Sequence, residues 1–190
     1  MLRPSLLLSL LVFTHQTYAS SLQDADKLLA SGNCKEAVKI YKAGSDKGIP
    51  YASFKLGLLH SSHSCVNLDF IAAEKYYQAA AQKGFKYAYA NLGSLYFGDD
   101  APLPDNEKAY KAWTKAKELG VDTRYNLSIL LYLGEGVEPS PLLAEEYLID
   151  LIKNNSNDAL LAKSLLMDFY SEENGPLYSE EKLERLKASL

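Results

Sequence analysis

The sequence predicts an all-α solenoid built from antiparallel helix pairs. Two observations lead to this prediction. Similar residues recur about every 36 positions, and each recurring unit carries two stretches with apolar residues at helical spacing. A unit of this size cannot bury its apolar face alone, so neighbouring units must stack around a shared core. The chain has 190 residues, 47% of them hydrophobic, which is enough to build such a core.

The composition excludes several other classes of protein. The formal charge is -4 at pH 7, with 20 basic and 24 acidic residues. A nucleic-acid-binding protein needs clustered Lys and Arg to neutralise phosphates, so we expect no nucleic-acid partner. The one long apolar run lies at the N-terminus, which argues against a multi-span membrane protein.

Residues 1–19 resemble a secretory signal peptide. Arg3 is positively charged, the stretch from Leu6 to Phe13 is almost wholly apolar, and Ala19 is a small residue at the expected cleavage point. The apolar stretch is shorter than the roughly 20 residues that a membrane-spanning helix needs. We therefore expect cleavage after Ala19, no stable membrane insertion afterwards, and a periplasmic or secreted protein. An uncleaved N-terminal anchor and a short core helix are the alternatives.

The repeats occupy residues 20–158, with a period of about 36. Alanine, aromatic and glycine positions keep the same register in three successive units: Ala37, Ala73 and Ala109; Tyr41, Tyr77 and Trp113; Gly48, Gly84 and Gly120. One further copy follows at a spacing of 35, with Leu127, Ser128, Ala144 and Leu148. Such agreement predicts structural repeats rather than a chance pattern.

Each unit is expected to contain two helices. The first covers residues 51–60 or 87–97, and the second covers residues such as 70–83. Asp69 and Asp105 precede second helices, where a carboxylate can cap free N–H groups. The recurring glycines follow second helices and are expected to end them in the left-handed conformation. Small residues in the first helices, such as Gly57 and Gly93, allow close packing against the recurring aromatic residues.

Residues 159–190 are expected to form C-terminal capping helices. Leu160, Leu161, Leu165, Leu166 and Phe169 form an apolar stripe suited to packing on the last repeat. Ser179 and Glu180 then open a final helix. The end of a solenoid needs a helix with a polar outer face, which this segment supplies.

These motifs resemble the Sel1-like repeats of the tetratricopeptide clan. The resemblance rests on two units: Ala52, Leu56, Gly57, Asp69, Ala73, Tyr76, Tyr77, Ala80, Ala81 and Gly84, then Ala88, Leu92, Gly93, Tyr96, Asp105, Ala109, Trp113, Ala116 and Gly120. The third unit has the loop Gly134-Glu135-Gly136-Val137. His60 and Ser128 depart from the pattern, and the third unit lacks the capping Asp. The resemblance implies a right-handed α-solenoid.

The two cysteines, Cys34 and Cys65, are expected to form a disulfide if the protein is exported. In the repeat frame, Cys34 opens a second helix and Cys65 lies between the helices of the next unit, so both fall at the same edge of adjacent hairpins. In a reducing compartment they would instead be two separate thiols.

A second possibility at the same place is a metal site. His60, His63 and Cys65 lie close together in sequence and could bind zinc or copper. The cluster lacks a fourth donor, and Cys65 has Cys34 as a partner, so we expect neither a metal nor another cofactor. No nucleophile elbow, phosphate loop or metalloprotease motif is present, and we expect the protein not to be an enzyme.

The resemblance implies that one face of the first helices lines a concave groove. The residues expected there to contact a partner are Tyr51, Phe54, Lys55, Leu58, Tyr87, Asn91, Ser94, Tyr125 and Ile129, with Phe97 and Tyr132 at the same spacing. Rigid aromatic side chains dominate many protein interfaces. Another protein or a peptide segment is therefore the expected partner of a chain that is a monomer when free.

The sequence thus favours an exported protein–protein interaction module with an aromatic groove. One alternative is a periplasmic immunity protein that neutralises a toxin, a role in which Sel1-like proteins are sometimes found. Another is a regulator or scaffold of an envelope signalling complex. A secreted virulence factor is a further possibility.

Overall fold

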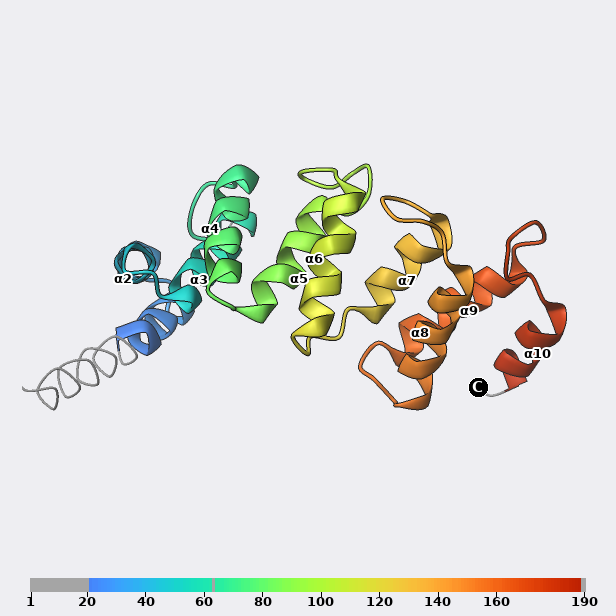
Figure 1. The fold of residues 1–190 in the computed structure, drawn as a ribbon. Coiled ribbons are helices and arrows are strands. Elements are labelled where there is room, and N and C mark those ends of the chain that lie inside the picture. The colour runs from blue at the N-terminus through green and yellow to red at the C-terminus, as the bar shows by residue number, and fades with distance from the viewer. Residues whose placement is uncertain (1–20, 63, 189–190) are drawn as a thin grey trace, which may run out of the picture. The chain divides into compact units, whose positions relative to one another are not determined.

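The fold is all α-helical in the part of the chain that this computed structural model describes, residues 21–62 and 64–188 (Figure 1). Residues 21–30 form the first helix of this part. The helices that follow are α2 (Cys34–Asp46), α3 (Pro50–Ser61), α4 (Phe70–Gln82), α5 (Lys86–Tyr96), α6 (Asn106–Glu118), α7 (Arg124–Leu133), α8 (Pro141–Lys153), α9 (Ala159–Ser171) and α10 (Glu180–Ala188).

The predicted signal peptide, residues 1–19, lies outside the described residues. Within them, no helix has both the length and the apolar character needed to span a bilayer.

The chain divides into two compact units, Met1–Ala88 and Tyr89–Leu190. In the first unit, α3 packs against both α2 and α4. In the second unit, α7 packs against α6 and α8, and α9 packs against α8 and α10. Helices that are consecutive in sequence thus pack side by side, as the predicted helix pairs require.

The ends of the helices follow the predicted capping pattern. The Asp69 side chain accepts a hydrogen bond from the backbone N–H of Ala72 at 2.9 Å, and Asp105 accepts one from Lys108 at the same distance. Both bonds satisfy N–H groups that a helix leaves free at its N-terminus. The three recurring glycines have positive φ angles between 74° and 81°, which confirms the predicted left-handed helix ends.

The recurring aromatic residues form the cores of the two units. Tyr77 is 1% exposed and Trp113 is 2% exposed. Each ring lies directly over a glycine of the preceding helix. A Cβ added to Gly57 would lie 2.5 Å from Cδ1 of Tyr77, and one added to Gly93 would lie 2.2 Å from Nε1 of Trp113. Alternating small and large residues therefore let these helices approach closely, as the sequence predicts.

The polar atoms of Tyr77 and Trp113 find hydrogen-bond partners in their cores. In the first unit, the hydroxyls of Tyr77 and Ser61 lie 2.9 Å apart. In the second unit, the indole N–H of Trp113 donates to the carbonyl oxygen of Ala90 at 3.1 Å, and the Thr123 hydroxyl donates to the Trp113 carbonyl oxygen at 2.7 Å. These bonds remove the cost of burying the polar atoms.

A disulfide joins Cys34 and Cys65 in the first unit, with Cα atoms 5.3 Å apart. Cys34 is the first residue of α2, and Cys65 lies in the loop between α3 and α4. The bond therefore fixes the start of the second helix of one pair to the loop within the next pair, at the edge where the repeat frame places both residues.

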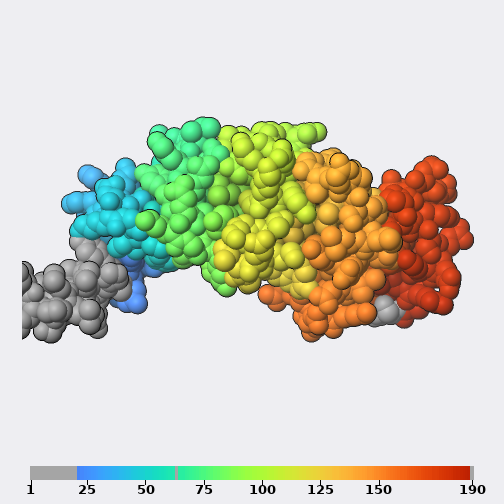
Figure 2. All heavy atoms as spheres, viewed as in Figure 1, coloured from blue at the N-terminus to red at the C-terminus, as the bar shows by residue number. Residues whose placement is uncertain are grey.

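The C-terminal segment contains two helices, and α10 buries none of its residues. In Figure 2 the atoms of the terminal segment, drawn in red, lie against those of the preceding helix pair, drawn in orange. The expected apolar stripe on α9 is only partly correct. Leu166 and Phe169 are buried, whereas Leu160 is 80% exposed and Leu161 is 54% exposed. Ala162 of the same turn is fully buried, so Leu160 and Leu161 lie on the exposed side of α9.

Candidate protein-binding surface

Four aromatic side chains of the first unit pack together, and we call them the aromatic cluster: Tyr51, Phe54, Phe85 and Tyr87. Phe85, in the turn between α4 and α5, is at the centre. Its ring centroid lies 4.7 Å from that of Phe54, 6.1 Å from that of Tyr51 and 5.9 Å from that of Tyr87. Edge-to-face and tilted contacts at these distances are favourable because of the ring quadrupoles.

The cluster is anchored on one side and open on the other. Phe54 also packs against the buried ring of Tyr77, with centroids 5.9 Å apart. Tyr87 is 49% exposed, and the ammonium of Lys86 lies 5.3 Å from the centre of its ring. The exposed ring of Tyr87 therefore rests on a layer of aromatic side chains that are themselves connected to the core.

A single carboxylate, that of Asp26, fixes the α3 end of this cluster. Asp26 comes from the helix at residues 21–30 and accepts hydrogen bonds from the hydroxyls of Tyr41 (2.6 Å) and Tyr51 (2.7 Å). The ammonium of Lys55 lies 2.9 Å from the same carboxylate. Charge-assisted bonds of this kind are stronger than neutral ones, so Asp26 holds Tyr51 and Lys55 in one geometry.

These contacts change the acidity of the groups involved. Burial alone would raise the pKa of Asp26, but the hydrogen bonds from Lys55, Tyr41 and Tyr51 outweigh it and lower the pKa below its ordinary value of 3.8. Burial and the bond to Asp26 raise the pKa of Tyr51 to about 12. The same two causes raise the pKa of Tyr41. At neutral pH the carboxylate is therefore charged and both phenols are neutral.

We expect Asp26→Asn to lower the free energy of unfolding by about 1–2 kcal/mol at pH 7, because it removes charge-assisted hydrogen bonds. The pKa of Asp26 is lower in the folded chain, so its charge stabilises the fold above pH 3.8, and this stabilisation is lost as the pH falls through the folded value. The difference between the variant and the parent protein should therefore shrink in acid. Urea unfolding of both proteins at pH 7 and pH 3 measures this difference in the free energy of unfolding.

Asp24→Asn is the matched control for this substitution. Asp24 lies on the same helix and pairs with the exposed Lys27, 3.0 Å away. Exposed pairs of this kind contribute little, so we expect a change below about 0.5 kcal/mol. Equal effects of the two substitutions would contradict the role assigned to Asp26.

The remaining predicted contact residues are half-buried or exposed. In the first unit, Leu58 is half-buried. In the second unit, Ser94 is exposed, while Asn91, Tyr125 and Ile129 are half-buried. Their role in binding stays a prediction.

Of the two other residues at the same spacing, Tyr132 is buried and Phe97 is half-buried. Tyr132 is 8% exposed, stacks on Phe169 with ring centroids 3.6 Å apart, and donates a hydrogen bond to Glu172 at 2.5 Å. Phe97 packs on Trp113 at 5.1 Å. The expectation that Tyr132 faces a partner is therefore wrong, because the C-terminal segment covers it.

Sequence reasoning missed Phe85 and Asp26. Phe85 directly follows Gly84, and a large apolar residue after a helix-ending glycine commonly packs back on the helix, which was the available signal. Nothing in the spacing of Asp26 distinguishes it from a surface carboxylate. Its partners lie 15 and 25 residues away in sequence.

The suspected metal cluster has other contacts. Cys65 is bonded to Cys34, and the His60 ring stacks on Tyr76 with centroids 5.5 Å apart. His63 lies outside the described residues. In the described ranges, no three His, Cys, Asp or Glu side chains are grouped so that they could hold a metal ion.

Stacked helix pairs with small residues under aromatic ones define a class of α-helical repeat proteins. The Sel1 repeat family matches residues 50–85, 86–121 and 122–149, more than half of the chain. The chain therefore belongs to the Sel1 repeat family. No curated protein matches it.

The solved structures that are similar to this chain include the following two. A Sel1 repeat protein from Oxalobacter formigenes has a TM-score of 0.60 and 22% identity, over 81% of this chain and 62% of that one. The protective antigen c5321, present in uropathogenic Escherichia coli strains and displaying an SLR fold, has a TM-score of 0.65 and 21% identity, over 88% of this chain and 40% of that one. The chain spans less than two thirds of each, and at these identities the likeness shows the fold.

Sel1 repeat proteins generally mediate protein–protein interactions, and the repeat is typically a non-catalytic module. This agrees with the class of function that the sequence favours.

Proposed function

We propose that this protein is an exported interaction module that binds a segment of another protein through the aromatic cluster. The observation that carries the proposal is the exposed ring of Tyr87 resting on the packed rings of Phe85 and Phe54. Side chains at the centre of protein interfaces are often large aromatic residues held in place before binding.

The energetic argument is that the surface is already ordered. A Tyr side chain offers a large contact area with few rotatable bonds, so little conformational entropy is lost on binding. Asp26 restrains Tyr51 and Lys55 in the same way. Lys55 thus keeps a fixed position beside the ring of Tyr51, with its charge paired to Asp26.

The proposal of export rests on the N-terminal sequence and on the disulfide. Disulfides persist in oxidising compartments and are rare in reducing ones. The bond between Cys34 and Cys65 is therefore compatible with a location outside the cytoplasm.

We expect Tyr87→Ala to weaken binding to the partner at least tenfold, as loss of a central aromatic contact does at other interfaces. The partner is first captured from an envelope fraction on the immobilised protein and identified by mass spectrometry. Its affinity for the parent protein and the variant is then measured by titration calorimetry. Mass spectrometry of the cellular protein also checks export, since cleavage gives an N-terminus at Ser20.

Tyr178→Ala is the control for this experiment. Tyr178 is 42% exposed, similar to Tyr87, and belongs to the C-terminal segment of the second unit. Circular dichroism should show that both variants keep the fold. Undiminished binding by Tyr87→Ala, or equal losses for the two variants, would contradict binding through the aromatic cluster.

A further inference from the structure

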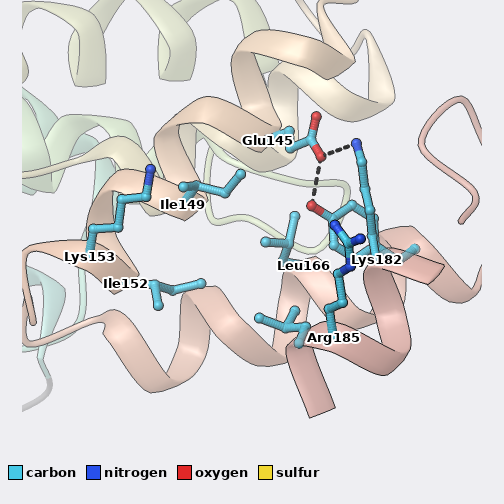
Figure 3. A pocket seen from close by; sticks show the side chains of 9 residues that line it. Glu145, Ile149, Ile152, Lys153, Leu166, Lys182 and Arg185 are labelled. Carbon is cyan, nitrogen blue, oxygen red and sulfur yellow. Dashed lines mark hydrogen bonds and ion pairs between the residues drawn. The ribbon is translucent and has the colours of Figure 1, made fainter. Parts of the chain in front are cut away.

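A hollow lies in the second unit, where side chains of α8, α9 and α10 line it. It has a volume of about 550 Å³, within the range of binding pockets. Figure 3 shows the side chains of Ile149 and Ile152 from α8 and Leu166 from α9 at this hollow, with Lys182 and Arg185 reaching toward it from α10. We call this hollow the C-terminal cleft.

The C-terminal cleft runs along the helices that line it. On α8 it is lined by Glu145, Ile149, Ile152 and Lys153, which recur at the spacing of one helix face over about two turns, roughly 12 Å. On α10 it is lined by Lys182, Arg185 and Leu186, again on one face. An elongated apolar floor between two helices matches the shape of another short helix.

The charges around the cleft are mostly positive. Lys153, Lys182 and Arg185 line it with a single carboxylate, that of Glu145, although the whole chain carries a net charge of -4. Glu145 is 9% exposed and already holds two groups, the Lys182 ammonium and the Tyr170 hydroxyl, each at 2.6 Å. This carboxylate is thus neutralised within the wall of the cleft.

The other two cations remain available to a ligand. Arg185 pairs with Glu181 one turn away, but both side chains are about three-quarters exposed, and such pairs exchange readily with other partners. Lys153 has no ion pair in the part of the chain described by the structure. Nearby on α8, Asp150 is held by Arg124, while Glu146 is exposed on the neighbouring side of the helix.

This cleft is separate from the surface of the aromatic cluster. It belongs to the second unit, whereas the aromatic cluster belongs to the first, and the two sites share no residue.

We propose that the C-terminal cleft is a second docking site, which takes a short amphipathic helix with acidic flanks from a protein partner. Apolar side chains of that helix contact Ile149, Ile152 and Leu166. Its carboxylates pair with Lys153 on one side and Arg185 on the other. The complementary charges orient the helix and favour an acidic partner over a basic one.

The test uses a fluorescein-labelled 14-residue peptide with Leu at one helix face and Glu on both flanks, measured by fluorescence anisotropy. The control peptide carries Gln in place of every Glu. We expect the acidic peptide to bind the parent protein saturably, and the control peptide to bind it at least tenfold more weakly. The double variant Lys153→Gln with Arg185→Gln should bind the acidic peptide at least tenfold more weakly than the parent protein does. Added salt should weaken binding in the same direction.

The double variant Lys108→Gln with Lys111→Gln is the matched control, because it removes the same charge from exposed positions on α6. It should bind the acidic peptide like the parent protein, and so should Tyr87→Ala. Absence of binding, or equal binding by both double variants, would overturn the proposal. The proposal would also be overturned if dodecanoate bound below its critical micelle concentration and the peptide did not bind. That result would indicate an anionic amphiphile as the ligand.

Discussion

Reduction of the Cys34–Cys65 disulfide is expected to lower the free energy of unfolding of the first unit by about 3–4 kcal/mol. The bond closes a loop across a sequence separation of 31 residues. In the chain-entropy description, a disulfide stabilises a protein by restricting the conformations of its unfolded state. Opening a loop of this size removes that restriction and lowers the free energy of unfolding by about 3–4 kcal/mol. The double variant Cys34→Ser with Cys65→Ser should show the same loss. Urea unfolding followed by circular dichroism measures the total change, and hydrogen exchange with mass spectrometry assigns it to α2, α3 and α4.

The reductant itself provides the control. Added to the double serine variant, it should change nothing, because the variant has no cysteine left. If the parent protein keeps its exchange protection in α2 and α3 after complete reduction, the disulfide contributes little to the fold, and the expectation is wrong.

Gly93→Ala is expected to destabilise the second unit by about 2 kcal/mol, although alanine is the better helix former. Alanine would ordinarily stabilise a helix by about 1 kcal/mol relative to glycine. Here its Cβ would lie 2.2 Å from Nε1 and 2.4 Å from Cδ1 of Trp113, so the ring must move. Overpacking of this kind costs about 1–3 kcal/mol and occasionally more. It also disturbs the hydrogen bond from the indole to Ala90. Fluorescence of Trp113, the only tryptophan in the chain, reports the unfolding.

Two controls separate this cause from a general effect on α5. Ser94→Ala changes the next residue of the same helix, which is exposed, and should alter stability by less than about 0.5 kcal/mol. In a Trp113→Leu background, followed by circular dichroism, Gly93→Ala should cost much less, because leucine leaves room for the added methyl group. Additive losses in the double variant would show that the ring contact is not the cause.

The fold could be predicted from the sequence because its packing requirements repeat. Gly57 with Tyr77 and Gly93 with Trp113 solve the same steric problem in successive units. Their spacing therefore reveals both the helices and the way in which they pack. The capping residues Asp69 and Asp105 act within one turn, where sequence distance and spatial distance agree.

The candidate surface could be predicted only in part. Tyr51, Phe54 and Tyr87 follow from helical spacing, but the contact of Tyr51 with Asp26 depends on a helix outside the matched repeats. Likewise, burial of Tyr132 depends on Phe169 and Glu172, which belong to the C-terminal segment. Non-repeating segments determine these contacts, so the repeat pattern holds no information about them.

The position of the disulfide has a consequence for the order in which this protein opens. In an array of stacked repeats, each unit draws its stability from its neighbours, and melting begins at an end where one neighbour is missing. The covalent tie between α2 and the loop after α3 protects these helices, whereas α10 has no disulfide and buries none of its residues. We therefore expect α10 to open before α2 and α3, and a protease that samples transient openings to cut α10 before these helices.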